Sequence, residues 1–372
     1  MECRIGDIYS ERSQRGADDM ELLSVTLNDG VMPRSEIEGK DNSSEDKSNY
    51  KVVCKGDMVY NSMRMWQGAN GVSDYDGIVS PAYTVLMPNK EIDNRYFASL
   101  FKTPNLINEF RKYSQGLTSD TWNLKYPQIR SIRLYIPSLQ EQHKISVFIS
   151  TLEERIGIQR QLVDSLKKYK RGLLHEILCE KIKVTKSVWN VHKIGDYLNS
   201  KNIKQLPTPD APLMAFTATG GVCDKGERYD RGFLVKDAST KLYKRTDLND
   251  FIYSSNNLDV GSIGLNLYGS AVISDVYEIF SISGADPWFI SEAIQQKSVL
   301  HQILKYRQGC LYGQYRIYAE DFLEVSIRVP PLETQKQIGT IFSRIEYKIK
   351  SEQALLDNLE RAKTFFLQQL FI

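Results

Sequence analysis

The stretch PSLQEQHKISVFISTLEERIGIQRQLVDSLKKYKRGLLHEIL, from Pro137 to Leu178, decides the fold because the chain contains it twice. The second copy, PPLETQKQIGTIFSRIEYKIKSEQALLDNLERAKTFFLQQLF, begins 193 residues later at Pro330 and ends at Phe371. The copies align without a gap, and such internal repetition fixes the architecture before any single motif is considered. Identical residues match at Pro137 and Pro330, Leu139 and Leu332, Gln142 and Gln335, Ile145 and Ile338, Glu153 and Glu346, Asp164 and Asp357, and Lys170 and Lys363.

Both copies predict long helices. Apolar residues recur at steps of three and four, which places one apolar stripe on each helix. Ser138 and Glu141 form a capping-box pattern at the first helix start. A helix of about 40 residues is roughly 60 Å long, so it cannot bury its stripe inside a small domain. We therefore expect an antiparallel helix pair that acts as a spacer, with a globular module at each end. The alternative is two unrelated coiled-coil tails that recruit other chains.

The composition limits the function classes. With 48 Lys and Arg against 46 Asp and Glu the chain is nearly neutral, so any nucleic-acid binding must come from local patches rather than from bulk charge. The five cysteines form no C-x-x-C pair and the four histidines are isolated, which argues against a zinc site. The sequence opens with no signal peptide and contains no long apolar run. These features predict a reduced, cytoplasmic protein.

The repeat extends beyond the helices. The triplet Ile-Gly-Asp at residues 5–7 recurs at 194–196, and Trp189 precedes only the second copy, so we expect a shortened N-terminus. The predicted fold class is α+β, with two globular modules that contain small twisted β-sheets and are separated by the antiparallel helix pair. The predicted segments are 1–136 for the first module, 137–186 for the first helix, 187–329 for the second module and 330–372 for the second helix.

Each module has a coarse secondary-structure pattern. Alternating residues in Tyr50–Ser62 predict strands around a Lys-Gly-Asp turn, and another strand is expected at Gly77–Leu86. The polar segment between residues 30 and 49 is expected to be a loop. A single short helix is predicted at Tyr96–Tyr113, with a counterpart at Trp288–Tyr306.

The search for catalytic motifs finds none. The sequence has no phosphate-binding loop of the form G-x-x-x-x-G-K-[ST], no G-x-S-x-G and no H-E-x-x-H. Asp286-Pro287-Trp288-Phe289 faintly resembles the Asn/Asp-Pro-Pro-Tyr motif of amino-methyltransferases, but it lacks the second proline. A helix start with proline near the first position is the better interpretation. The two halves share their helix and framework residues, whereas their loops differ. This pattern fits a duplicated recognition protein better than a duplicated enzyme.

Cations alternate with aromatic and amide residues in loops of both modules. Arg and Lys can reach guanine edges or phosphates, and Asn and Gln can pair with adenine. A basic run formed by Lys167, Lys168, Lys170 and Arg171 is interpreted as a solvated helix face, and the alternative is a face that follows DNA phosphates. The predicted DNA-binding residues are Arg64, Trp66, Gln67, Asn70, Lys112, Tyr113, Gln115, Thr118, Trp122, Asn123 and Lys125 in the first module, and Asn256, Asn257, Arg307, Gln308, Tyr312, Gln314, Tyr315 and Arg316 in the second. Arg111, Arg245, Tyr306 and Tyr318 belong to the same stretches.

On these residues the chain resembles the specificity subunits of type I restriction–modification systems. The resemblance rests on P-x-L-x-E-Q-x-x-I at 137–145 and P-L-E-x-Q-x-x-I at 331–338, each of which opens a long helix after a variable module. A Tyr-x-Gln-Gly turn precedes each helix, at 113–116 and 306–309. Thr334 departs from the pattern, since the family favours glutamate there.

The resemblance implies a non-catalytic protein. Each module would read one half of a bipartite, asymmetric double-stranded DNA sequence, and the helix pair would set the gap. The chain would hold no cofactor or metal. Two methyltransferase subunits using S-adenosylmethionine and restriction–translocase subunits using ATP and Mg would be its partners. The alternatives are a protein–protein scaffold, which would lack steep salt dependence on DNA, and a stand-alone DNA-modification enzyme, which would itself bind S-adenosylmethionine.

Overall fold

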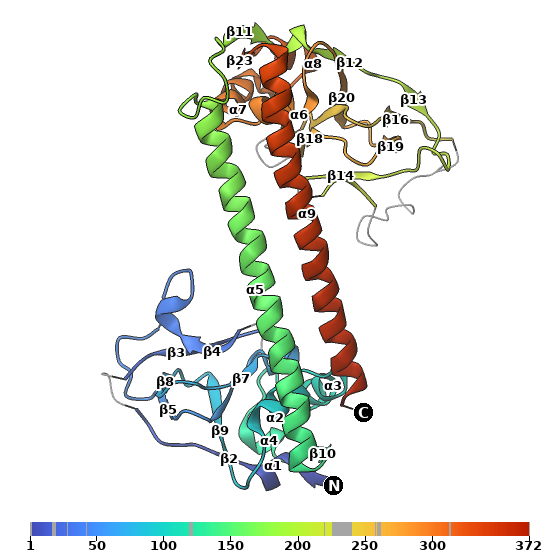
Figure 1. The fold of residues 1–372 in the computed structure, drawn as a ribbon. Coiled ribbons are helices and arrows are strands. Elements are labelled where there is room, and N and C mark those ends of the chain that lie inside the picture. The colour runs from blue at the N-terminus through green and yellow to red at the C-terminus, as the bar shows by residue number, and fades with distance from the viewer. Residues whose placement is uncertain are drawn as a thin grey trace. The chain divides into compact units, whose positions relative to one another are not determined.

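The computed structural model forms two compact units (Figure 1). Unit 1 comprises Met1–Gln161 and Gln353–Ile372, and unit 2 comprises Leu162–Glu352. Each long helix therefore contributes one part to each unit. The structure describes residues 2–16, 20–27, 29–41, 43–118, 122–218, 220–224, 240–256, 258, 262–311 and 314–371.

The two repeated stretches are long helices, as predicted. Helix α5 spans Leu139–Leu178 and helix α9 spans Leu332–Gln369. The Ser138 hydroxyl accepts a hydrogen bond from the Glu141 backbone N–H at 3.3 Å, which is the first arm of the expected capping box. The prolines of both copies lie just ahead of the helices, where a missing backbone N–H costs nothing.

The two helices run antiparallel within unit 1. Phe366 packs edge-on against Phe148 with ring centroids 4.9 Å apart. One turn further along α5, Glu153 pairs with Lys363 at 2.6 Å, and residue numbers thus fall along α9 as they rise along α5. In unit 2, Lys170 pairs with Glu346 at 2.9 Å in the same sense. The antiparallel prediction is confirmed within each unit.

The globular part of unit 1 is built from short strands and helices. Strands β2, β9, β6 and β7 form an antiparallel sheet in that order, and β3–β4, β5–β8 and β1–β10 form separate pairs. The elements are β1 (Glu2–Arg4), α1 (Ile5–Ile8), β2 (Tyr9–Glu11), β3 (Leu23–Thr26), β4 (Gly30–Pro33), η1 (Arg34–Glu36), β5 (Lys51–Val53), β6 (Met58–Asn61), η2 (Met65–Gln67), β7 (Asn70–Val72), β8 (Gly77–Val79), β9 (Tyr83–Pro88), α2 (Asn94–Leu100), α3 (Pro104–Tyr113), α4 (Tyr126–Ile129) and β10 (Arg133–Tyr135).

Unit 2 repeats this plan. Its sheet order β12-β20-β17-β18 matches β2-β9-β6-β7, and β14–β15 and β11–β23 match two of the pairs, while the counterpart of β5–β8 is a three-stranded sheet in the order β13-β16-β19. The elements are β11 (Asn190–Lys193), η3 (Ile194–Asp196), β12 (Leu198–Ser200), β13 (Lys204–Gln205), β14 (Ala215–Thr217), β15 (Gly221–Cys223), β16 (Tyr243–Thr246), β17 (Phe251–Ser254), β18 (Ile263–Leu265), β19 (Ala271–Ile273), β20 (Tyr277–Ile282), α6 (Pro287–Ile294), α7 (Lys297–Ile303), η6 (Leu304–Tyr306), β21 (Gln308–Leu311), β22 (Gln314–Arg316), α8 (Ala319–Leu323) and β23 (Ser326–Val329).

The repeated glutamine explains why its motif occurs twice. Gln142 is 3% exposed, donates from Nε2 to the Pro137 carbonyl at 3.0 Å and accepts from the Asp93 N–H at 3.2 Å. Gln335 is 2% exposed and makes the same two bonds, to the Pro330 carbonyl at 2.8 Å and from the Asp286 N–H at 3.1 Å. The motif thus fastens the start of each long helix to the start of α2 or α6.

The aromatic core of each unit is completed by the long helices. In unit 1, Phe97 and Phe101 pack with Tyr96, which contacts Phe371 just after α9 at a ring-centroid distance of 5.1 Å. In unit 2, the stacked rings of β17, β20 and α8 include Tyr253 and Phe322, 4.4 Å apart. Ile338 and Phe342 of α9 belong to the same core as these rings. Burial of these rings therefore holds each module against its helix segments.

Four element predictions need correction. The single helix at 96–113 is two helices, α2 and α3, because Pro104 cannot lie inside a helix and instead starts α3. The same break recurs between α6 and α7 without a proline to signal it. The strand at 77–86 is interrupted at Pro81 into β8 and β9. The polar segment from residue 30 contains β4 and η1 before the loop begins.

Candidate nucleic-acid interface

Three segments of unit 1 bring two tryptophans and an arginine together. Trp66 of η2 packs edge-on against Trp122, with ring centroids 5.3 Å apart. The Arg111 guanidinium carbon of α3 lies 5.6 Å from the centroid of the Trp66 ring. The Trp66 indole N–H donates to the Met63 carbonyl at 3.0 Å, which fixes the ring orientation. We call Trp66, Trp122 and Arg111 the tryptophan cluster.

Unit 2 has an arginine–tyrosine cluster. The Arg307 guanidinium carbon lies 5.3 Å from the Tyr315 ring centroid, and that of Arg316 lies 5.1 Å from the Tyr318 ring centroid. Arg316 also donates to the Glu278 carboxylate at 3.0 Å, while its side chain remains 45% exposed. We call Arg307, Tyr315, Arg316 and Tyr318 the arginine–tyrosine cluster.

The two clusters occupy equivalent places in the repeat. In unit 1, Gln115 and Asn123 form a backbone bridge, each N–H donating to the other's carbonyl at 3.0 and 2.8 Å. In unit 2, 193 residues later, Gln308 pairs with Arg316 in the β21–β22 ladder. The residue before Asn123 is Trp122, and the residue before Arg316 is Tyr315. Each is an aromatic member of its cluster. The same local frame therefore carries different side chains.

This chemistry suits a nucleic acid. An arginine stacked on an aromatic ring keeps its N–H donors free at the edge of the guanidinium, where they can meet a phosphate or a guanine. Exposed aromatic faces can stack on bases or pack against a thymine methyl group. The pairing of Arg316 with Glu278 holds its side chain in one direction, which favours a specific contact over a diffuse one.

The remaining predicted residues are placed less uniformly. Asn70 is fully buried and donates to the Gly68 carbonyl at 3.1 Å, so it cannot reach a DNA base in this structure. Lys112 pairs with Glu109 at 2.6 Å but is 68% exposed. The Gln308 side chain donates to Asp321 at 2.6 Å. Arg64, Gln67, Tyr113, Gln115, Thr118, Lys125 and Asn256 are exposed, Gln314 lies on β22, and Asn257 and Tyr312 lie outside the described residues.

No sequence pattern marks the carboxylate that orients Arg316. Glu278 lies on β20, 38 residues upstream of Arg316, and it also accepts from Lys244 at 2.9 Å. Only the pairing of β20 and β16 with their neighbours brings these residues together. Arg245 also belongs to the predicted stretches. Its side chain pairs with Asp247 at 3.0 Å instead.

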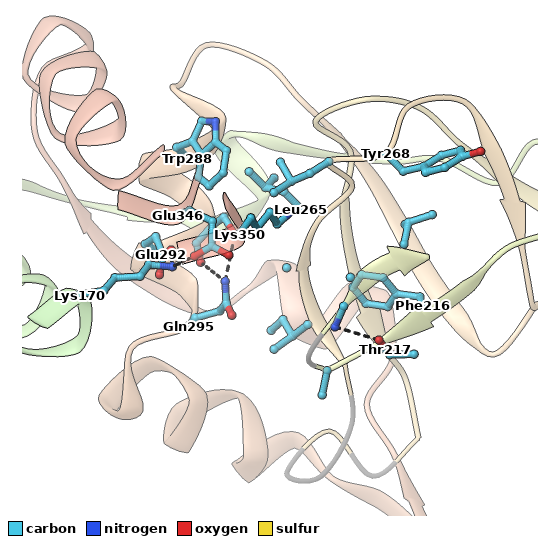
Figure 2. A pocket seen from close by; sticks show the side chains of 18 residues that line it. Lys170, Phe216, Thr217, Leu265, Tyr268, Trp288, Glu292, Gln295, Glu346 and Lys350 are labelled. Atoms are coloured by element: carbon cyan, nitrogen blue, oxygen red, sulfur yellow. Dashed lines mark hydrogen bonds and ion pairs between the residues drawn. The ribbon is translucent and has the colours of Figure 1, made fainter. Parts of the chain in front are cut away.

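The prediction for the basic run on α5 needs correction at one position, Lys170. Lys167, Lys168 and Arg171 are exposed, as the solvated-face interpretation expects. Lys170 is only 18% exposed and pairs with Glu292 of α6 at 2.6 Å and with Glu346 of α9. Figure 2 shows these three side chains converging at one wall of an open cavity of about 420 Å³ in unit 2.

The described residues show neither a metal site nor a membrane span. They contain no group of three or more His, Cys, Asp or Glu side chains placed to hold a metal ion. None of their helices is long and apolar enough to cross a bilayer.

Comparison with protein families identifies the repeat. A family model described as type I restriction modification DNA specificity domain matches residues 4–168 and again residues 186–361. The chain belongs to this family. Its members are the specificity subunits of type I restriction–modification systems, which recognise DNA and carry no catalytic role. The two matches correspond to two recognition domains in one chain.

Individual relatives agree with the family match. The chain is 22% identical over 354 residues to the type I restriction enzyme MjaX specificity subunit of Methanocaldococcus jannaschii, covering 87% of this chain and 79% of that protein. It is 27% identical over 129 residues to the HindI specificity subunit of Haemophilus influenzae, covering 33% and 28% of the two chains.

Solved structures share the fold. The S subunit of a type I system from M. genitalium superposes with a TM-score of 0.67 at 14% identity, covering 100% of this chain and 96% of that one. A chain from a structure of complex assembly in a type I system gives a TM-score of 0.51 at 14% identity, with 100% and 97% covered. At such identity the likeness concerns the fold. The predicted α+β fold with two modules and two long helices is confirmed.

Proposed function

We propose that each recognition module reads one half of a bipartite, asymmetric DNA sequence. The observation that carries this proposal is the pair of clusters at repeat-equivalent positions, one built on tryptophans and one on arginines and tyrosines. Two identical surfaces would suit a palindrome, whereas two different surfaces on one frame suit two different half-sites. The modules proposed for this role are residues 1–136 and 187–329, with the helices at 137–186 and 330–372 between and after them.

The proposed contacts begin with the exposed members of both clusters. Arg111, Arg307 and Arg316 would meet phosphates or guanine edges, since arginine pairs with guanine through two donors. Trp122 and Tyr315 would lie against bases or sugars. Asn70 is left out because it is buried. The other proposed residues are Arg64, Trp66, Gln67, Lys112, Tyr113, Gln115, Thr118, Asn123, Lys125, Asn256, Asn257, Gln308, Tyr312 and Gln314.

The helix pair is proposed to set the gap between the half-sites. Each long helix belongs with one end to unit 1 and with the other to unit 2. Removing one turn from both helices together, around Gln159 and Glu352, shortens each by about 5.4 Å. Since DNA advances 3.4 Å per base pair, the recognised gap should shrink by about one or two base pairs while both half-sites stay the same. A change in the half-sites themselves would exclude a spacer role.

The proposed partners are two methyltransferase subunits and the restriction–translocase subunits of a cytoplasmic complex. S-adenosylmethionine would bind to the former, and ATP with Mg to the latter. Exposed apolar residues on the helices support subunit docking, because such side chains are seldom left in water without a partner. They include Phe148 at 44% exposure and Phe365 at 56% in unit 1, and Tyr347 at 58% in unit 2.

The first test is to co-express the chain with the methyltransferase encoded beside it and to map methylated adenines across the host genome by long-read sequencing. The proposal expects a motif with two specified parts and one fixed unspecified gap. A continuous motif, or no motif from a complex shown to be intact, would contradict it. The control omits this chain, and methylation should then disappear although the methyltransferase is present.

A further inference from the structure

Lys170 lies at the meeting point of three helices in unit 2. Its ammonium group is 2.6 Å from the Glu292 carboxylate of α6 and 2.9 Å from the Glu346 carboxylate of α9. The three side chains are 18%, 12% and 24% exposed. Figure 2 shows Lys170 pointing from α5 toward both carboxylates beside Gln295. One cation on the helix pair thus holds a helix of the recognition module.

The two carboxylates keep the Lys170 amine in its charged form despite its burial. Burial lowers the pKa of the Lys170 amine, but the charges and hydrogen bonds of Glu292 and Glu346 outweigh burial and raise it overall. The lysine is therefore charged at neutral pH. Charge-assisted hydrogen bonds of this kind hold their groups in a narrower range of positions than apolar contacts do.

A second contact lies at the other end of α6. Asp286, the residue before this helix, donates its backbone N–H to Gln335 of α9 at 3.1 Å. Glu292 follows six residues later, which is about 9 Å along a helix. Helix α6 is therefore fastened to the long helices at two separated points, and two points fix the direction of an axis as well as its position.

Among the described residues, the hydrogen bonds and ion pairs that fasten the equivalent helix of unit 1 to the long helices all lie at one end. Glu153 and Lys363 reproduce the pair between the long helices at 2.6 Å, but Ser99 occupies the position that corresponds to Glu292. The side-chain bonds between α2 and α5 gather at Asp93, which accepts from Ser146 at 2.6 Å and lies 3.0 Å from the His143 ring nitrogen. These contacts lie at the start of α2, beside the glutamine contact.

We infer that Lys170, acting through Glu292, is the positioning residue that fixes the angle of the second recognition module against the helix pair. By fixing this angle, Lys170 also fixes where the second module meets the DNA, and this position contributes to the length of the gap between the half-sites. This inference rests on the proposed function. A module free to turn about the contact at Asp286 would carry the arginine–tyrosine cluster along the DNA axis. A shift of about 3.4 Å there equals one base pair.

The test is the distribution of gap lengths, measured on a plasmid library in which the two half-sites are separated by gaps of every length near the natural one. The complex with its methyltransferase subunits is reconstituted with the full chain and with Glu292→Ala. We expect the unchanged chain to methylate one gap length. For Glu292→Ala we expect methylation at gaps one base pair longer or shorter to rise about tenfold, equivalent to about 1.4 kcal/mol.

Glu346→Ala is the matched control, because it removes the other carboxylate of the same lysine and leaves the Lys170–Glu292 contact in place. Its thermal stability should fall to a similar degree while its gap stays fixed. Lys170→Arg, which keeps the charge, should also retain the fixed gap. If Glu292→Ala does not fold, Glu292→Gln replaces it, since the amide preserves shape and removes only the charge.

The outcomes separate the inference from the function. A wild-type complex without a two-part motif contradicts the proposed function itself. A wild-type complex with one gap length, together with Glu292→Ala that keeps the same single gap, overturns the positioning role alone. Equal relaxation in Glu292→Ala and Glu346→Ala also overturns it, since that result would mean a general loosening of unit 2.

Discussion

Gln142 of α5 and Gln335 of α9 make the same two hydrogen bonds, in unit 1 and unit 2 respectively, yet the side chains around them differ. Asp93 beside Gln142 accepts from Ser146, whereas the position equivalent to Ser146 in unit 2 is Gly339. A Cβ atom on Gly339 would lie 1.9 Å from the Asp286 carboxylate oxygen. The repeat therefore keeps the two hydrogen bonds of the glutamine and varies the side chains that support them in each unit.

The reading surfaces differ more than the anchors do. The tryptophan cluster and the arginine–tyrosine cluster share one repeat-equivalent position, Trp122 and Tyr315, and their only common residue type is arginine, at positions that do not correspond. A backbone anchor requires one geometry, so one residue type serves both copies. A reading surface requires only that its donors match its own half-site, so its residues are free to diverge.

The largest expected effect breaks one reading surface. Replacing Arg307, Gln308 and Arg316 together by alanine should abolish discrimination at one half-site and leave the other intact. Each lost base contact costs about 1–3 kcal/mol, so the combined loss of methylation rate should reach at least about a hundredfold. Methylation of a library randomised in one half-site at a time measures this. Equal loss of discrimination at both half-sites would show that the modules do not read independently.

The second effect concerns the shared anchor. Gln142→Ala and Gln335→Ala each leave a part-buried or buried carbonyl and a part-buried N–H without their partner, and we expect each to lower the free energy of unfolding by about 2–4 kcal/mol. The two losses should be similar because the bonds are the same. Urea denaturation of the whole chain, followed by circular dichroism, measures them. A loss confined to one variant would refute the equivalence of the two anchors.

The third effect tests the residues that differ between the two anchors, Ser146 beside Asp93 and Gly339 beside Asp286. Ser146→Ala removes a hydrogen bond to a charged acceptor and should cost about 1.5–3 kcal/mol. Gly339→Ala pushes the Asp286 carboxylate from its place, where it caps α6 by accepting from the Phe289 N–H at 2.9 Å, so we expect a loss of about 0.5–2 kcal/mol. The same denaturation assay applies. A stabilising Gly339→Ala would show that the carboxylate has room to move.

The smallest effect is a difference in titration. Burial raises the pKa of both aspartates, but hydrogen bonds from Ser146, Tyr96 and His143 bring the pKa of Asp93 below its usual 3.8, while the pKa of Asp286 stays above it. The Asp93 carboxylate therefore stabilises the fold above pH 3.8 and loses this contribution as the pH falls through its folded pKa. The Asp286 carboxylate opposes folding above its folded pKa, and this cost disappears as the pH falls.

We accordingly expect Asp93→Asn to destabilise the protein more than Asp286→Asn at neutral pH. Asparagine still caps a helix, so the charge is the main thing removed. The difference between the two variants should shrink as the pH falls below 3.8. Denaturation curves of both variants at several pH values check this, and a difference that grows at acid pH would reverse the assignment.

Much of the architecture was readable from the chain. The gapless repeat predicted the two long helices, their antiparallel pairing and the two modules, because a stripe of that length needs a partner of equal length. Asp286-Pro287 was interpreted as a helix start, and α6 does begin there. The sequence does not predict the break between α6 and α7, because no proline or glycine marks it at Gln295 and Gln296.

The candidate site was readable only in part. Sequence spacing singled out Trp66, Trp122, Arg307, Tyr315 and Arg316, and the fold brings them into two clusters. Asn70 shares their composition but is buried, because alternation along β7 turns its side chain inward. Composition alone does not distinguish these cases.

The repeat, the two long helices and the family follow from the amino-acid sequence, because periodic apolar residues and duplicated motifs act over short distances along the chain. The contact of Lys170 with Glu292 and Glu346, 122 and 176 residues away, follows from the fold instead. The fold likewise decided that Glu278 orients Arg316. Such pairs depend on which elements the sheets and helices bring side by side, and Coulombic attraction acts through space and not along the chain.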